Sequence, residues 1–302
     1  MKRISLFILM FHISAKAQEI SLSFDDAPMR SMSLYSGLQR TDRLIKILKN
    51  HNVKVVFFSN SSKLNKFNGK ERMSRYAEEG HLIANHTHKH LDLRKVTVEE
   101  YIGDIEKAGE LLKKFPTFKK WFRYPYLAHG NSTIKRDKVR TFLSKKGYEN
   151  GYVTIDTQDW FMASLVNRHI QNGGKIDEKR LCKAYSGMLW DTIDYFHQQS
   201  LKHLGRSPKH MILLHENDLA ALCLEVLVKK IKSQKWKIIS PESAMKDPIY
   251  AIKPKTMNNN DGQVSALIHE KKGIEIADPW SHPWNDGKLI KDEFEKRKVF
   301  IE

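Results

Sequence analysis

Short apolar runs alternate with amphipathic stretches through the first 240 residues of the chain. The apolar runs are rich in β-branched and aromatic residues, which predicts strands at 19–24, 53–58, 82–85, 121–124, 151–155, 210–214 and 236–240. Between them, apolar positions recur at helical spacing, most clearly after Thr97, which opens a capping box with Glu100. Further helices are predicted at 41–51, 70–79, 134–146, 177–204 and 219–233.

This alternation predicts βαβ units and a parallel sheet. Polar residues follow the ends of most predicted strands, and they are Asp25, Asp26, His86, Tyr126, Asp156, Asp159 and His215. Side chains from so many strand ends meet only at the C-terminal mouth of a closed or nearly closed barrel. We therefore expect an α/β barrel of seven strands, with an open doubly wound sheet as the alternative. The chain has no G-x-G-x-x-G or P-loop motif that would support nucleotide binding.

The periodic pattern weakens after Ser240. The chain has 302 residues, of which 40% are hydrophobic, and this is enough for one large core. We expect a barrel domain at 18–244 and a C-terminal extension at 245–302 that packs on the barrel, with a mobile loop near Asn258.

The first 17 residues have the layout of a secretory signal peptide. Lys2 and Arg3 precede an apolar stretch at 4–13, and Ala15-Lys16-Ala17 places small residues at the usual cleavage spacing. The stretch is too short for a comfortable membrane span, and uncleaved anchoring is the weaker alternative. We therefore expect export to the periplasm, the cell envelope or the medium, with no stable membrane span after cleavage.

Charge and cysteine content narrow the partners and the chemistry. The chain carries 52 Lys and Arg against 35 Asp and Glu, a formal net charge of +17, which favours contact with acidic polymers or anionic headgroups. No basic stripe with interleaved aromatic residues is present, so nucleic acid is not an expected partner. Cys182 and Cys223 could pair in an exported protein, but each also falls on the apolar side of a predicted helix, and we favour buried free thiols.

One cluster of residues predicts metal-dependent chemistry. His86 and His90 stand four residues apart in the segment His86-Thr87-His88-Lys89-His90, and Asp26 follows the first predicted strand. One carboxylate and two imidazoles form a three-ligand set for a divalent metal, and such a set leaves positions open for water and substrate. The adjacent Asp25 is then free to act as a general base. The sequence therefore predicts a hydrolase.

Five segments, in order along the chain, resemble the polysaccharide deacetylases with the NodB homology domain, also called carbohydrate esterase family 4. They are Ser23-Phe24-Asp25-Asp26-Ala27-Pro28, His86-Thr87-His88-Lys89-His90, Arg123-Tyr124-Pro125-Tyr126, Asp156-Thr157-Gln158-Asp159-Trp160 and Leu213-Leu214-His215. The resemblance covers residues 19 to 240. It implies a distorted (β/α)7 barrel, which agrees with the seven strands predicted independently.

The resemblance also implies a role for each matching residue. It makes Asp25 the general base, oriented by Arg123. It makes the metal ligands Asp26, His86 and His90, with Zn²⁺ as the expected metal and Co²⁺ as the alternative. It makes His215 the general acid, oriented by Asp159. The Tyr126 backbone N–H would help to hold the oxyanion, and Trp160 and Leu213 would line a pocket for the acetyl methyl group.

The implied reaction is removal of N-acetyl groups from an acetylated polysaccharide or oligosaccharide, such as peptidoglycan or a chitin-like polymer. Two alternatives remain, a metal-free amidase or imidase on the same barrel and a non-catalytic carbohydrate-binding protein. Two features depart from the family pattern. Ala27 stands where the family has glycine, and the interval from Asp159 to His215 is long. The polymer, O- versus N-deacetylation, the native metal and the oligomeric state stay open.

Overall fold

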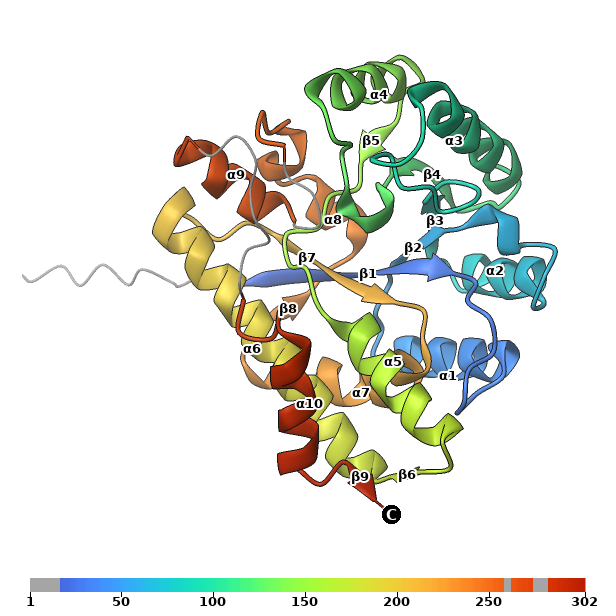
Figure 1. Cartoon of the computed structure of the whole chain (residues 1–302), viewed down its shortest axis with the longest axis vertical. Coiled ribbons are helices and arrows are strands. Elements are labelled where there is room, and N and C mark those ends of the chain that lie inside the picture. The colour runs from blue at the N-terminus through green and yellow to red at the C-terminus, as the bar shows by residue number, and fades with distance from the viewer. Residues whose placement is uncertain (1–16, 258–261, 274–281, 302) are drawn as a thin grey trace, which may run out of the picture.

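The computed structural model describes residues 17–257, 262–273 and 282–301. A curled parallel sheet forms the centre of the molecule, and helices surround it (Figure 1). The sheet has seven strands in the order β5-β4-β3-β2-β1-β7, and β8 pairs with β1. Their bounds are β1 Glu19–Ala27, β2 Val56–Ser59, β3 Leu82–Asn85, β4 Phe118–Phe122, β5 Glu149–Asn150, β7 His210–His215 and β8 Lys237–Ile238. The predicted α/β barrel of seven strands is confirmed.

Helices connect the parallel strands and cover the outside of the sheet. They are α1 Gly37–Asn50, α2 Gly69–Glu78, α3 Val98–Leu112, α4 Thr133–Lys145, α5 Asp159–Gln171, α6 Glu178–Leu204 and α7 Asp218–Ser233. Thr97 caps α3 through the predicted capping box with Glu100. The sequence did not predict α5. Within the described residues, no helix is both long and apolar enough to cross a membrane.

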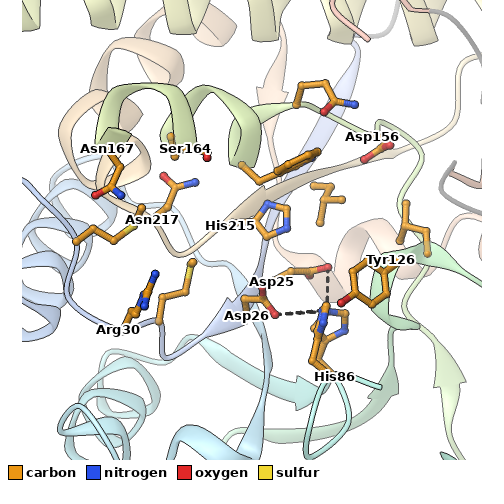
Figure 2. Close-up of a pocket in the computed structure, with 18 residues that line it drawn as sticks. Asp25, Asp26, Arg30, His86, Tyr126, Asp156, Ser164, Asn167, His215 and Asn217 are labelled. Atoms are coloured by element: carbon orange, nitrogen blue, oxygen red, sulfur yellow. Dashed lines mark ion pairs between the residues drawn. The ribbon is translucent and has the colours of Figure 1, made fainter. Parts of the chain in front are cut away.

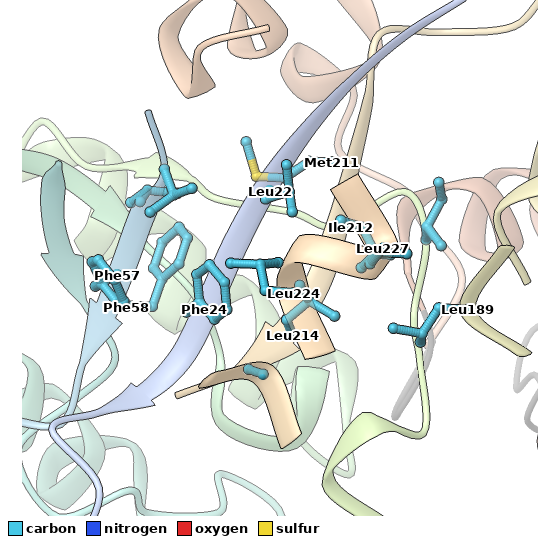
Figure 3. Close-up of a cluster of buried hydrophobic side chains, with 14 of the residues drawn as sticks. Leu22, Phe24, Phe57, Phe58, Leu189, Met211, Ile212, Leu214, Leu224 and Leu227 are labelled. Carbon is cyan, nitrogen blue, oxygen red and sulfur yellow. The ribbon is translucent and has the colours of Figure 1, made fainter. Parts of the chain in front are cut away.

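Strand β1 shows how the sequence divides its side chains between two environments. Ile20, Leu22 and Phe24 alternate with Ser21, Ser23 and Asp25, and successive residues of a strand point to opposite faces. Figure 3 shows Leu22 and Phe24 in the apolar layer, with residues of β2, β7 and α7 around them. The Phe24 ring stacks on Phe57 of β2 at a centroid distance of 5.3 Å. The polar half of β1 therefore lies on the barrel interior, where the site forms.

The sheet closes through a segment that changes partners. Residues of β5 pair with β4, and Ile155 then pairs with Ile212 of β7. The predicted strand at 151–155 is therefore wrong in its bounds, because the backbone crosses from one strand to another. Gly151 marks the departure point, since a Cβ there would lie 2.3 Å from the Phe58 ring. A curled parallel sheet whose two edges are joined by one crossing segment fits a distorted (β/α)7 barrel.

The described residues after β8 form α8 Pro241–Met245, α9 Gln263–Lys271, α10 Gly287–Lys296 and β9 Phe300–Ile301. Helix α8 packs against β1 and β7, α9 against α6, and α10 against α5 and α6. Strand β9 pairs antiparallel with β6 Lys175–Ile176, in a two-stranded sheet that the sequence did not predict. The predicted signal peptide, except for Ala17, and the predicted mobile loop near Asn258 lie outside the described residues.

Cys182 of α6 and Cys223 of α7 form a disulfide bond, so the prediction of free thiols is wrong. The two helices pack side by side, which brings the Cα atoms within 4.8 Å. This spacing is inside the range that a disulfide requires. Each cysteine does face the apolar side of its helix, as predicted, but those two sides face each other.

Candidate active site

A pocket of about 600 Å³ opens at the C-terminal ends of the strands (Figure 2). The register between β1 and β7 places Asp25 beside His215. The predicted site residues that line the pocket are Asp25, Asp26, His86, His90, Tyr126, Trp160, Leu213 and His215. The other two, Arg123 and Asp159, do not line it but bond to Asp25 and His215. The structure therefore brings all the predicted site residues together.

Asp26, His86 and His90 present one carboxylate oxygen and two imidazole nitrogens within 4.8 Å of one another. Asp26 Oδ1 lies 3.3 Å from His90 Nε2 and 4.0 Å from His86 Nε2. This oxygen is buried, and no described residue donates a hydrogen bond to it. A cation would satisfy a buried carboxylate oxygen that faces two imidazole nitrogens. The donor set therefore fits a divalent metal that accepts mixed nitrogen and oxygen ligands.

Neighbouring groups orient the two histidines. His86 Nδ1 lies 2.9 Å from the carbonyl oxygen of Arg123, so Nδ1 carries the proton and Nε2 turns its lone pair toward Asp26. The backbone N–H of His90 donates to Thr87 Oγ1 at 2.9 Å. Burial lowers the pKa of His90 to about 4, so this ring is neutral at pH 7. A neutral imidazole is the form that binds a metal.

The charge around Asp26 favours its carboxylate form. Burial by itself raises the pKa of an aspartate. Here His90, Lys63 and His86 outweigh burial and hold the pKa of Asp26 well below its ordinary value. Lys63 Nζ also donates to the backbone oxygen of Asp26 at 3.3 Å. Asp26 is therefore a negatively charged ligand at neutral pH.

Arg123 fixes the second carboxylate, Asp25, which is almost fully buried. Arg123 Nη1 donates to Asp25 Oδ1 at 2.6 Å and to Ser23 Oγ at 2.9 Å. The guanidinium lies 3.8 Å above the centre of the Phe58 ring, and Nε donates to the Gly151 carbonyl at 2.8 Å. These contacts leave Asp25 Oδ2 directed to the metal ligands, 3.6 Å from His86 Nε2. Asp25 is therefore placed to accept a proton beside the ligand set.

Asp159 fixes His215, which lies at the end of β7 beside Asp25. Asp159 Oδ1 lies 2.7 Å from His215 Nδ1, and Asp159 Oδ2 accepts the backbone N–H of His215 at 2.8 Å. The amide of Asn217 also donates to Asp159 Oδ2, at 3.0 Å. Burial by itself lowers the pKa of His215, but the Asp159 carboxylate outweighs it and raises the pKa to about 9. His215 is therefore protonated at neutral pH, and Nε2 is the nitrogen left to face the pocket.

Tyr126, Trp160 and Leu213 belong to the apolar part of the pocket wall. Tyr126 and Trp160 are half exposed, at 50% each, whereas Leu213 is buried. The Tyr126 ring packs edge-on against His90 at a centroid distance of 4.6 Å. Helix α5 begins at Asp159, so its first turn sends Asp159 inward and Trp160 to the pocket rim. Helix α5, which the sequence did not predict, therefore determines the positions of two predicted site residues, Asp159 and Trp160.

Several residues around the ligand set have left-handed backbone conformations. The φ angles are 66° at Asp26, 66° at Thr87, 59° at His90 and 58° at Tyr126. A non-glycine residue in this region costs on the order of 1–3 kcal/mol, and such residues concentrate at functional sites. Ala27 has no positive φ, so the alanine at this position is not strained. The departure from the family glycine has no backbone consequence here.

Sequence reasoning missed a buried ion-pair network beneath the pocket. Arg72 donates to Glu216 at 2.5 Å, and Arg40 donates to Asp218 at 2.7 Å. All four side chains are nearly or completely buried. The network joins α1 and α2 to the turn after β7 and to the start of α7, and it binds the backbone of the loop at 28–36. Its members are more than 140 positions apart in the sequence, so no local pattern indicates the pairing.

The part of the pocket farthest from the metal ligands was also not predicted. Its residues come from the loop after β1, from one face of α5 and from the turn after β7. They are Met29, Arg30, Met32, Ser164, Asn167 and Asn217. No sequence motif marks these residues as part of a site. Only the three-residue spacing of Ser164 and Asn167 could have indicated that they lie on the same face of a helix.

Comparison with known proteins places this site in context. Residues 12–149 match the family model described as polysaccharide deacetylase. The peptidoglycan-N-acetylglucosamine deacetylase of Bacillus cereus is 33% identical over 175 residues, which cover 52% of this chain and 58% of that relative. The chitin deacetylase of Colletotrichum lindemuthianum is 26% identical over 141 residues, 43% of this chain and 53% of that relative. The matches thus span little more than half of these relatives.

Solved structures agree on the fold. The chitin deacetylase of Colletotrichum lindemuthianum superposes with a TM-score of 0.54 at 18% identity, covering 77% of this chain and 89% of that one. A peptidoglycan N-acetylglucosamine deacetylase superposes with a TM-score of 0.51 at 24% identity, covering 76% and 88%. A pseudoenzyme from Bacillus anthracis also reaches 0.51, at 16% identity, covering 76% and 66%. Since enzymes and a pseudoenzyme share the fold, activity has to be argued from the side chains.

Proposed function

Because the chain belongs to the polysaccharide deacetylase family, we propose that it is a metal-dependent hydrolase that removes N-acetyl groups from a sugar polymer or oligomer, peptidoglycan or chitin-like, and releases acetate. One observation carries the proposal. Asp25, fixed by Arg123, and His215, fixed by Asp159, line the same pocket as the donor set of Asp26, His86 and His90. A base, an acid and a metal site in one pocket are the parts that amide hydrolysis needs.

Asp26, His86 and His90 would hold the metal, Zn²⁺ or Co²⁺. When bound, such an ion polarises an acetamide carbonyl and lowers the pKa of a water molecule. The protein supplies the fixed geometry, because the backbone carbonyl of Arg123 orients His86 and Thr87 holds the loop at His90.

Asp25 acts as the general base in this proposal. Its Oδ1 is occupied by Arg123, so Oδ2 takes the proton of the attacking water. The Tyr126 backbone N–H helps to stabilise the negative charge that develops on the carbonyl oxygen. Trp160 and Leu213 contact the acetyl methyl group from the apolar wall.

His215 acts as the general acid. An amine is a poor leaving group unless it is protonated as the carbon–nitrogen bond breaks. The Asp159 contact keeps His215 protonated at neutral pH and turns Nε2 toward the pocket. The products are acetate and a free amino group on the sugar.

Acetate release tests the proposal. Purified protein should release acetate from chitooligosaccharide or from peptidoglycan, should lose this activity when a chelator removes its metal, and should regain it with Zn²⁺ or Co²⁺. Full activity after verified metal removal would identify a metal-free amidase. Sugar binding without acetate release on any acetylated glycan would identify a carbohydrate-binding protein.

Export is part of the same proposal. Lys2 and Arg3, the apolar stretch after them and Ala15-Lys16-Ala17 support it. Mass spectrometry of protein recovered from the envelope or the medium should find an N-terminus near Gln18. Recovery of the full-length chain from the cytosol alone would remove the argument for an exported enzyme.

A further inference from the structure

The pocket has two chemically different ends, as Figure 2 shows. Asp26, His86 and Tyr126 lie at one end, and Arg30, Ser164 and Asn167 lie at the other. The carboxylates that line the pocket, Asp25, Asp26 and Asp156, are not at the Arg30 end. The reaction centre proposed above uses none of the three residues of that end.

Arg30 brings an uncompensated positive charge to its end of the pocket. Its side chain is exposed, and in the described part of the chain no acidic group lies within ion-pair distance of it. The other two arginines of this region differ, since Arg40 pairs with Asp218 and Arg72 pairs with Glu216. The guanidinium of Arg30 therefore has its five N–H donors available to a ligand.

The buried network beneath the pocket holds the backbone that carries Arg30. Arg40 Nη1 donates to the carbonyl oxygen of Arg30 at 3.0 Å. The neighbouring Met29 is held on both sides, because its N–H donates to Glu216 at 2.7 Å and its carbonyl accepts from Arg72 at 2.7 Å. A side chain on such a clamped backbone is presented to a ligand with less loss of freedom.

Asn167 and Ser164 add hydrogen-bond donors at the same end. Asn167 Oδ1 accepts the backbone N–H of Ser33 at 3.0 Å and the Ser33 hydroxyl at 2.6 Å. The backbone donor fixes the orientation of the amide, so Nδ2 is left as a donor. Ser164 lies one helical turn earlier on α5 and also lines the pocket. The end thus combines a cation, an amide N–H₂ and a hydroxyl.

We propose that Arg30, with Asn167 and Ser164, binds a carboxylate group of the substrate, so that the enzyme acts on N-acetylated sugars with an acidic group on the same or the neighbouring residue. The inference rests on the proposed deacetylase function and names its substrate class. Arginine matches a carboxylate because the planar guanidinium donates two parallel hydrogen bonds to the two oxygens. The side-chain charge at this end is positive only, which selects an anion over a neutral sugar.

Matched substrates test the proposal. The acidic substrate is a disaccharide of N-acetylglucosamine and N-acetylmuramic acid, and its control is the methyl ester of the same disaccharide. We expect kcat/KM for acetate release to be about tenfold higher for the acid, the effect of one charge-assisted contact. A hyaluronan tetrasaccharide carries its carboxylate on the ring next to the N-acetylated sugar. Comparing it with the disaccharide therefore shows whether the acidic group has to lie on the same or on the neighbouring residue.

Arg30→Gln and Arg168→Gln form the matched pair of variants. Both remove one exposed positive charge, and Arg168 follows Asn167 on α5 but does not line the pocket. Arg30→Gln should lower the acid-to-ester ratio of kcat/KM about tenfold, whereas Arg168→Gln should leave the ratio unchanged. The ester reaction reports whether each variant is still folded and active.

The inference is overturned if the wild-type enzyme hydrolyses both substrates equally well, or if Arg30→Gln keeps the preference for the acid. If Arg30→Gln and Arg168→Gln lose the preference for the acid equally, the preference comes from general charge attraction, and the inference is also overturned. Hydrolysis of none of the substrates would refute the proposed function instead. In that case, NMR-detected binding of N-acetylmuramic acid decides the inference, which requires weaker binding by Arg30→Gln than by Arg168→Gln.

Discussion

Asp159 binds His215 through both the side chain and the backbone, with contacts of 2.7 Å to Nδ1 and 2.8 Å from the peptide N–H. The two residues lie 56 positions apart, at the start of α5 and at the end of β7. The contact has an electrostatic consequence, because burial lowers the pKa of a histidine while this carboxylate raises that of His215 to about 9. A general acid with this pKa stays protonated through the neutral range.

The pH dependence of the reaction should report this contact. A general acid must be protonated, so wild-type kcat should hold from pH 7 upward and fall near pH 9. Asp159→Asn removes the carboxylate, and the pKa of His215 should fall to the ordinary histidine range near 6.5. At pH 8 kcat should then drop about 30-fold, the loss of protonated fraction for that shift. A pH profile of Asp159→Asn that still falls only near pH 9 would contradict the assignment.

Substitution of the two neighbouring aspartates, Asp25 and Asp26, should have different effects on metal content and kcat. Asp26→Asn replaces a charged ligand by a neutral amide, so both metal content and kcat should fall. Asp25→Asn leaves the three ligands in place and removes the base, so metal content should stay near that of the wild type while kcat falls by about 10²–10⁴. Elemental analysis and kinetics on both variants decide this. An empty site in Asp25→Asn and a full one in Asp26→Asn would mean that the two roles are reversed.

The disulfide between Cys182 and Cys223 should stabilise the fold. It closes a loop with a sequence separation of 41, for which the restriction of the unfolded chain is worth about 2–4 kcal/mol. Cys182→Ala should therefore lower Tm by about 5–10 °C. The double variant Cys182→Ala/Cys223→Ala is the control, since the bond is already lost in the single variant and the further change should be small. Equal Tm values for wild type and Cys182→Ala would show that the bond does not stabilise the fold.

Two buried histidines should make the protein sensitive to mild acid. Burial lowers the pKa of both His129 and His210 to about 3, whereas unfolded histidines titrate near 6.5. Between these values the unfolded state binds more protons, so the free energy of unfolding falls as the pH falls. Each ring contributes up to about 1.4 kcal/mol per pH unit. Thermal unfolding at pH 7, 6 and 5 should show a falling Tm, and a flat Tm over this range would contradict the prediction.

The sequence predicted that polar residues at the strand ends would lie together, because parallel strands put their C-terminal ends at one edge of the barrel. Asp25 and His215 needed only the strand positions and the order of the strands to be placed near each other. The pairing of Arg72 with Glu216 could not be predicted, because it depends on how two helices approach a turn on another part of the chain. The same holds for Arg30, which reaches the pocket only through the path of an irregular loop.

The errors in the strands and helices have local causes. The strand predicted at 151–155 has an apolar sequence, but from Gly151 its backbone leaves β4 and crosses to β7. The hydrophobic pattern of a strand does not indicate such a change of pairing partner. Helix α5 begins at Asp159, inside the motif that ends at Trp160, and the sequence analysis assigned these residues to the site and not to a helix. The two-residue strands β6 and β9 are too short for any periodicity to show.

The pairing of β9 with β6 has a consequence for biosynthesis. A ribosome makes β6 more than 120 residues before β9, so Lys175 and Ile176 have no strand partner until Phe300 and Ile301 have been made. Helix α10, which packs against α5, is also made more than 110 residues after α5. The α5 wall therefore gains its outer support only after α10 and β9 have been translated. Until then, the helix that carries Trp160, Ser164 and Asn167 lacks its contacts with α10 in the nascent chain.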